Sequence, residues 1–138
     1  MSEVSVKRVI DLPAQKVWDL ISDFGDTSWM PTGTPAEVEG AGPGMARVIG
    51  AGDQKIREVL EACDVDARTL VYTIPEGVPF PVTGYRSSMV VSDSGDGCEL
   101  EWSCSFEPDG VSQEQAAAAI EGMYGVMIGW VAERAAKI

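Results

Sequence analysis

The sequence contains no histidine, and this absence removes several kinds of chemistry at once. It excludes a Ser-His-Asp or Cys-His nucleophile, histidine-ligated zinc or haem, and an imidazole acting as acid or base near neutral pH. The cysteines Cys63, Cys98 and Cys104 are odd in number and show no C-x-x-C spacing. We therefore interpret them as reduced core thiols of a cytoplasmic protein and expect no metal and no cofactor.

Basic residues are also few, since 10 Lys and Arg stand against 22 Asp and Glu and give a formal net charge of −12. Such a chain repels phosphate backbones and anionic lipid surfaces, so we expect no nucleic acid and no membrane surface as partner. No stretch approaches the roughly 18 apolar residues of a membrane span, and residues 1–11 lack the apolar core of a signal peptide. The length of 138 residues predicts one domain, 1–138.

The hydrophobic pattern changes twice along the chain. Residues 1–10 alternate as a strand, and the spacing then predicts a short helix from Pro13 to Phe24 and one further helical turn through Trp29 and Met30. Short alternating segments separated by Gly, Pro and Asp predict six more strands, at 36–40, 44–51, 55–64, 69–75, 84–92 and 97–107. Ser112 begins a long C-terminal helix. This order predicts an α+β fold with an antiparallel sheet and helices on one face.

Strand alternation predicts which side chains share the covered face of the sheet. On two adjacent strands this face is apolar apart from one opposite-charge pair, Arg47 and Glu58. Arg8 falls in phase with the inward residues of the first strand, and we expect it at the rim or in a bulge. One stripe of the final helix is expected to pack on the sheet, and it contains Ala116, Ala119, Ile120, Met123, Met127, Trp130 and Val131.

Short motifs spread over nearly the whole chain resemble one protein family. They are Ile10-Asp11-Leu12-Pro13-Ala14-x-x-Val17-Trp18, Ser22-Asp23-Phe24 with Trp29-x-Pro31, Gly42-Pro43-Gly44-x-x-Arg47, Arg57-Glu58-x-Leu60-x-x-x-Asp64 with Arg68, Pro79-Phe80-Pro81-Val82-x-x-Tyr85, and Glu101-Trp102-Ser103. Through them the chain resembles the START-like, Bet v 1-like superfamily, in particular its polyketide cyclase/dehydrase branch. The resemblance implies a helix-grip fold. In that fold a curved seven-stranded antiparallel sheet surrounds the long C-terminal helix, two short helices follow the first strand, and a hydrophobic cavity lies between sheet and helix.

Within this superfamily the chain is similar to the lachrymatory-factor synthases, which rearrange a small sulfenic acid, and to the abscisic acid receptors, which only bind their ligand. An arginine and a glutamate implicated in catalysis by the synthases match Arg47 and Glu58. The receptors' counterparts of Glu58, Tyr85 and Ser87 line the ligand site. Their polar contact on the last helix falls near Met127, which implies a more apolar cavity here, and residues 75–83 correspond to a mobile lid.

The Arg47 and Glu58 pair is the best functional candidate. The alternative is a structural cross-strand ion pair, which stabilises little when exposed. When such a pair is buried, desolvation offsets most of the attraction, so its presence beside a cavity favours a functional role. Arg47 would then hold a substrate oxygen that gains negative charge, Glu58 would move a proton, and Tyr85 would donate a hydrogen bond.

The other candidates expected to line the cavity are one serine and seven apolar or aromatic side chains: Ser87, Trp29, Tyr72, Phe80, Met89, Trp102, Met123 and Met127. Plain core packing is the competing interpretation for most of the large ones. The expected partner is a small hydrophobic molecule or lipid, bound by a monomer or a homodimer. The protein either converts this molecule by cofactor-free cyclisation, dehydration or isomerisation, or acts as its non-catalytic carrier or sensor.

Overall fold

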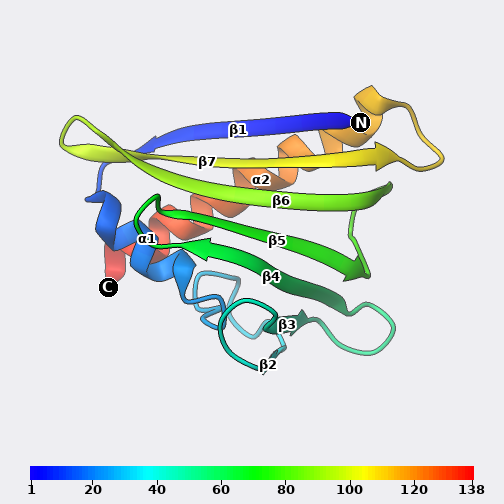
Figure 1. Ribbon diagram of the computed structural model, residues 1–138, viewed down its shortest axis with the longest axis horizontal. Helices are drawn as coiled ribbons and strands as arrows, with labels where there is room; N and C mark the ends of the chain where they lie inside the picture. The colour runs from blue at the N-terminus through cyan, green and yellow to red at the C-terminus, as the bar shows by residue number, and fades with distance from the viewer.

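A computed structural model describes all 138 residues as one antiparallel sheet with two helices (Figure 1). The strands are β1 (Ser2–Ile10), β2 (Ala36–Glu39), β3 (Ala46–Ile49), β4 (Ile56–Asp64), β5 (Thr69–Glu76), β6 (Val82–Ser94) and β7 (Gly97–Pro108), and the helices are α1 (Ala14–Ser22) and α2 (Gln113–Lys137). The strand order across the seven-stranded sheet is β1-β7-β6-β5-β4-β3-β2. The predicted seven-stranded sheet with a long C-terminal helix is confirmed.

The segment between β1 and β2 must cross the whole sheet, because these two strands form its opposite edges. Pro13 is the N-cap residue of α1, so its missing N–H leaves no hydrogen bond unmade. The predicted second short helix is wrong. Residues 23–34 form turns, in which the Met30 N–H donates to the Thr27 carbonyl over 3.0 Å. Pro31 prevents a helix here, since it has no N–H and disfavours helical backbone at the preceding residue.

Helix α2 lies along one face of the sheet, behind the strands in the view of Figure 1. It begins with a capping box, in which the Gln115 N–H donates to Ser112 Oγ over 3.1 Å and the Ser112 N–H donates to Gln115 Oε1 over 3.0 Å. These two bonds satisfy backbone donors that the first turn of a helix leaves free. The predicted start of this helix is therefore confirmed.

The predicted stripe of α2 is only partly correct. The buried residues of the helix are Ala116, Ile120, Tyr124, Ile128, Val131 and Ala135. Ala119 is exposed, while Met123, Met127 and Trp130 are half-buried. The buried positions recur mainly every four residues, which turns the methionines away from the closest helix-to-sheet contact.

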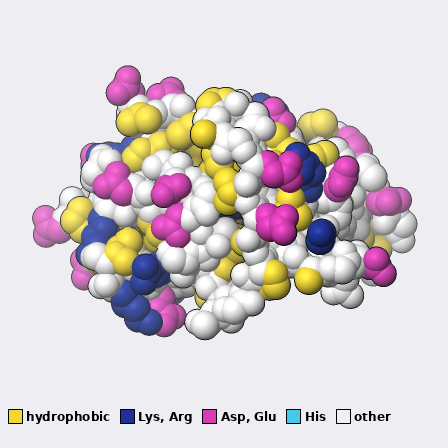
Figure 2. Space-filling model, turned by 90° about the horizontal axis from the view of Figure 1, so that it is seen from below, with side chains coloured by type: hydrophobic (Ala, Val, Ile, Leu, Met, Phe, Trp, Pro, Cys, Tyr) yellow, Lys and Arg dark blue, Asp and Glu magenta, His cyan; other side chains and the backbone are white.

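Charged side chains lie almost entirely on the surface. Among the 22 acidic residues only Glu58 is buried, and among the Lys and Arg residues only Arg47 is buried. Figure 2 shows acidic side chains spread across the face that is seen from below. Arg8 is exposed at the rim, and because β1 and β7 pair without a register shift there is no bulge. Neither helix has the length and apolar character needed to cross a membrane.

Candidate functional site

A cavity of about 330 Å³ lies between the sheet, α2 and the turn segment that follows α1. Its walls are mainly apolar and aromatic, and its only charged residues are Arg47 and Glu58. All the expected site residues except Ser87 and Met89 line it: Trp29, Arg47, Glu58, Tyr72, Phe80, Tyr85, Trp102, Met123 and Met127. The further lining residues are Met30, Pro31, Thr34, Ile49, Ile56, Ile74, Pro79 and Trp130. A mostly apolar hollow with a few polar groups is the usual form of a small-molecule site.

The two exceptions belong to the core beside the cavity. Met89 is buried in the hydrophobic core, on the same face of β6 as Tyr85. Ser87 is also buried, and its hydroxyl bonds to protein atoms on β7 and α2. Neither side chain forms part of the cavity wall.

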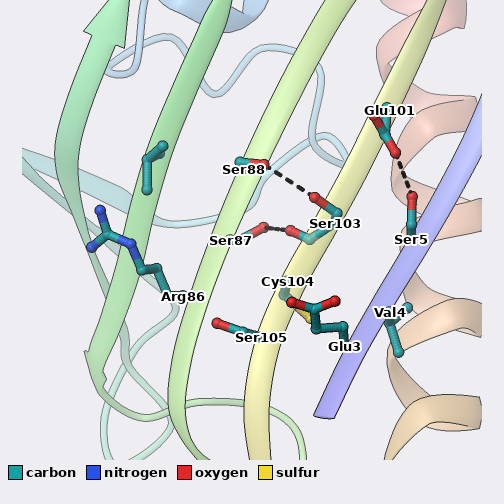
Figure 3. A pocket seen from close by; sticks show the side chains of 11 residues that line it. Glu3, Val4, Ser5, Arg86, Ser87, Ser88, Glu101, Ser103, Cys104 and Ser105 are labelled. Carbon is teal, nitrogen blue, oxygen red and sulfur yellow. Dashed lines mark hydrogen bonds between the residues drawn. The ribbon is translucent and has the colours of Figure 1, made fainter. Parts of the chain in front are cut away.

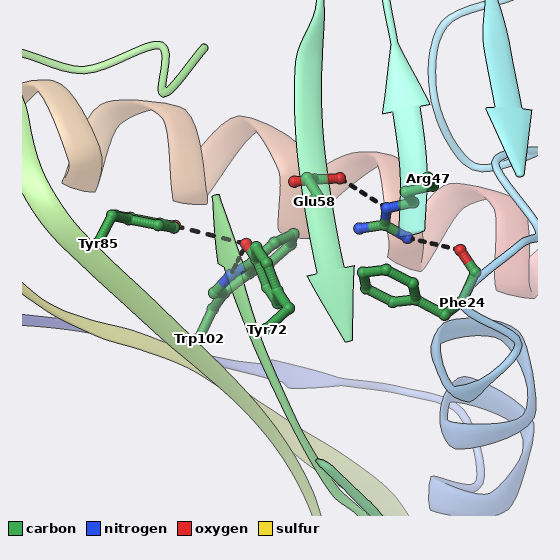
Figure 4. A network of polar contacts seen from close by, with 6 residues as sticks. All are labelled: Phe24, Arg47, Glu58, Tyr72, Tyr85 and Trp102. Carbon is green, nitrogen blue, oxygen red and sulfur yellow. Dashed lines mark hydrogen bonds and ion pairs between the residues drawn. The ribbon is translucent and has the colours of Figure 1, made fainter. Parts of the chain in front are cut away.

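Arg47 on β3 and Glu58 on β4 are direct cross-strand partners, as their strand phases predict. Arg47 Nε donates to Glu58 Oε1 over 2.6 Å, and Arg47 Nη1 donates to the Phe24 carbonyl over 3.1 Å (Figure 4). The guanidinium carbon also lies 4.0 Å from the centre of the Phe24 ring, within cation–π range. Three independent contacts therefore hold Arg47 in one orientation.

Strand alternation directs Glu58 into the cavity, opposite an irregularity in the neighbouring strand β5. The pairing of β4 with β5 shifts between Arg57 and Val59, so Glu58 sits at the irregularity while still facing Arg47 on β3. The extra residue belongs to β5, where Ile74 and Pro75 stand opposite the single residue Glu58 of β4. The side chain of Glu58 is 11% exposed, compared with 3% for Arg47. The carboxylate thus borders the open space while its partner lies behind it.

Each member of the pair keeps one unbonded polar atom. Arg47 Nη2 and Glu58 Oε2 form no hydrogen bond within the protein. No buried side-chain nitrogen or oxygen in the structure lacks a partner, so both atoms face open space. In Figure 4 they point to the same side, toward Tyr72 and Tyr85. A hydrogen-bond donor with positive charge and an acceptor that can take a proton are thereby presented together.

A second polar group in the site is a cluster of hydroxyls that contains all three tyrosines of the sequence. Tyr85 bonds through its hydroxyl to Tyr124 on α2 and, over 3.4 Å, to Tyr72. Burial, together with the negative charge of Glu58, raises the pKa of Tyr72 to about 12. Burial likewise raises the pKa of Tyr85 and of Tyr124 far above the usual value. The cluster is therefore fully protonated at neutral pH.

Tyr124 is the member of this cluster that sequence reasoning missed. The available signal was its spacing of four residues from Ile120 and from Ile128, which places all three on one side of a helix. Met123, Met127 and Trp130, which are spaced four and three residues apart, gave a competing hydrophobic stripe. Only the packing of α2 against the sheet shows which of the two stripes is buried.

The outer face of the sheet also carries a hollow, of about 510 Å³ (Figure 3). It is lined by serines and charged residues, and these bond to one another: Ser88 with Ser103 over 3.0 Å, and Ser5 with Glu101 over 2.7 Å. Only three of its 11 lining residues are hydrophobic, and it holds no buried ion pair. We interpret it as the solvated outer surface of an antiparallel sheet rather than a ligand site.

Comparison with known proteins agrees with this architecture. The model of the family described as polyketide cyclase/dehydrase and lipid transport matches residues 1–135. The chain belongs to this family. The family resemblance inferred from the sequence motifs is thus confirmed. None of the curated proteins compared with the sequence matches it.

Solved structures from bacteria and a plant share the fold of this family member. A Thermobifida fusca protein is 30% identical over 99% of this chain and 95% of its own, with a TM-score of 0.85. The Bacillus cereus protein XoxI is 28% identical over 97% and 95%, with a TM-score of 0.83. Norcoclaurine synthase from Thalictrum flavum, solved with dopamine and hydroxybenzaldehyde, is 16% identical over 99% and 87%, with a TM-score of 0.77. At that identity the synthase shows a common fold only.

Proposed function

We propose that the protein binds a small, mostly apolar molecule in the cavity beneath α2, with an oxygen of that molecule against Arg47 and Glu58. The observation that carries this proposal is one buried ion pair in a cavity whose walls are mainly apolar and aromatic. Burial of the walls' apolar surface by a ligand supplies affinity, whereas the two free polar atoms supply orientation. Family membership supports binding of this kind.

The test is native mass spectrometry of the protein purified from its own host, in search of a small molecule that co-purifies. Met127→Trp fills the cavity, and we expect it to remove the bound mass. The matched control is Val126→Trp on the next position of α2, where the side chain is 49% exposed and lines no cavity. A bound mass that survives Met127→Trp contradicts this site.

A catalytic role is favoured by the free oxygen of Glu58 beside the free nitrogen of Arg47. In this version Glu58 takes a proton from, or gives one to, a carbon or oxygen of the substrate. Arg47 stabilises negative charge that develops on the adjacent substrate oxygen. No cofactor is required for a cyclisation, dehydration or isomerisation of this type.

The competing version is a carrier or sensor that uses the same pair only to orient its ligand. Glu58→Gln separates the two, because it keeps the shape of the side chain and removes its ability to exchange a proton. Retained affinity with turnover reduced at least a hundredfold supports the enzyme, in line with the usual contribution of general acid–base catalysis. Unchanged turnover contradicts Glu58 as the acid or base.

A further inference from the structure

The hydroxyl cluster beside the cavity has a fixed direction of hydrogen bonding, which follows from counting its protons. Ser87 Oγ lies 2.9 Å from the Ser103 carbonyl oxygen, which only accepts, so the Ser87 proton is committed to that bond. Ser87 Oγ also lies 3.0 Å from the Tyr124 hydroxyl. Since Ser87 has a single proton, Tyr124 must donate to Ser87.

The same count continues toward the cavity. Tyr124 has given its proton to Ser87, so in the contact between Tyr124 and Tyr85 the donor must be Tyr85. Trp102 Nε1, which only donates, gives its proton to Tyr72 and Ser87, each over 3.0 Å. Tyr72 then keeps its own proton for Tyr85, across the longest contact of the cluster, 3.4 Å.

The opposite direction leaves the cluster incomplete. If Ser87 donated to Tyr124, two oxygen lone pairs would face each other across the 2.9 Å between Ser87 Oγ and the Ser103 carbonyl. Two oxygens held at hydrogen-bond distance with no proton between them repel each other. Only the direction Tyr72 to Tyr85 to Tyr124 to Ser87 to Ser103 gives every contact a proton.

The two tyrosines at the start of this sequence, Tyr72 and Tyr85, are the ones that line the cavity. Tyr85 has no proton to give and presents a lone pair. Within the hydroxyl cluster, Tyr72 holds the only proton that can turn to a ligand, because its bond to Tyr85 is long and weak. The hydrogen-bond donor to the ligand is therefore Tyr72, and not Tyr85 as expected from the sequence.

Resting on the proposed function, we infer that the ligand carries a hydroxyl group, such as a phenol, enol or alcohol, at the end that meets Tyr72 and Tyr85. A hydroxyl accepts from Tyr72 and donates to Tyr85 at the same time. A ketone, ether or carboxylate has no proton for Tyr85 and leaves two acceptors facing each other. Tyr72 and Tyr85 are therefore specificity-determining residues, and Ser87 is a positioning residue that acts through Tyr124.

The test compares two fluorescent probes, 6-hydroxy-2-acetylnaphthalene and its 6-methoxy ether, whose ketone can face Arg47. We expect the wild type to bind the hydroxy probe at least about tenfold more tightly, because the ether leaves an acceptor unpaired. Ser87→Ala removes the acceptor of the Tyr124 proton, so the direction can reverse and Tyr85 can donate to the ether. The preference should then fall to about threefold or less.

Matched variants separate this effect from size and from general damage. Ser88→Ala removes the neighbouring hydroxyl, which bonds to Ser103 Oγ on the outer face, and should keep the preference. Ser87→Thr restores the hydroxyl and should restore the preference. If Ser87→Ala does not fold, Tyr85→Phe provides a second route, since it deletes the acceptor that recognises the hydroxyl and should also abolish the preference.

The outcomes distinguish the two proposals. Equal affinity of the wild type for both probes, or the same preference in Ser87→Ala and wild type, overturns the inferred direction but leaves a binding cavity in place. Absence of binding by either probe, together with no co-purifying molecule in native mass spectrometry, contradicts the proposed function and the inference that rests on it.

Discussion

Two arginine–glutamate pairs lie side by side in the sheet and face opposite sides of it. Arg47 and Glu58 are 2.6 Å apart with side chains 3% and 11% exposed, whereas Arg57 and Glu39 are 2.8 Å apart with side chains 33% and 55% exposed. Arg57 directly precedes Glu58 in the chain, so strand alternation alone sends the two pairs to different environments. Both pairs join an arginine to a glutamate at nearly the same distance. The exposed pair is a surface contact, whereas the buried pair is the polar centre of a cavity.

The comparison shows that the distance between two charged groups does not indicate how much the protein depends on their ion pair. Water screens the outer pair, which can break without leaving a desolvated charge. The inner pair has lost its hydration, so removing one partner leaves the other uncompensated. Two experiments test this difference between the pairs, and a third tests the buried hydroxyl cluster beside the inner pair.

Breaking the inner pair should give the largest effect. We expect Glu58→Leu to reduce the free energy of unfolding by about 3–5 kcal/mol, because it strands the buried Arg47 guanidinium. The double variant Arg47→Met, Glu58→Leu should recover most of this loss, since no charge is left buried. Urea unfolding of both variants measures the two values, and equal destabilisation by the single and double variants would contradict this explanation.

Alkaline pH should give the next largest effect, on the interior hydroxyl cluster. The pKa of Tyr72 is raised from 10.0 to about 12, so its contribution to stability is fully present below pH 10 and is lost as pH rises toward 12. The folded state keeps the proton that the unfolded state releases, and Tyr72 alone should contribute a loss of about 3 kcal/mol over that interval.

Two measurements check the alkaline prediction. Urea unfolding at about pH 8 and about pH 11 gives the loss of stability. In Tyr72→Phe the unfolding free energy should fall less steeply with pH, because about one proton fewer is released on unfolding. Phenolate absorbance should stay absent from the native protein at the higher pH, because all three tyrosines lie in the cluster. Phenolate formation without unfolding would show that the hydroxyls are in contact with solvent.

Breaking the outer pair should give the smallest effect. Arg57, through its hydrogen bond and its charge, lowers the pKa of Glu39 below its usual value, so the contribution of this carboxylate is present at neutral pH and is lost as pH falls through the lowered pKa. We expect Glu39→Gln to lower the midpoint of urea unfolding only slightly at neutral pH, because an exposed ion pair contributes little. A loss comparable with that of Glu58→Leu would remove the distinction between the two pairs.

Much of this arrangement could be predicted from the sequence. Period-two alternation was enough to place Arg47 and Glu58 on one face of neighbouring strands, and their register confirms it. The start of α2 at Ser112 was also readable, since its capping chemistry is local. The prediction of a second short helix was wrong. The apolar residues Trp29 and Met30 fit the pattern of a helical turn, but Pro31 prevents a helix from forming there.

The absence of histidine and the single inward-facing carboxylate are properties of the sequence, and they alone direct proton chemistry to Glu58 and the tyrosines. The tertiary structure decided how the hydroxyls are connected. Tyr124 is 52 residues from Tyr72 in the numbering, and only the packing of α2 on the sheet joins it to Tyr85 and Ser87. The direction of the hydrogen bonds depends on contacts among the four elements β5, β6, β7 and α2, because a proton is assigned only when every donor and acceptor around it is known.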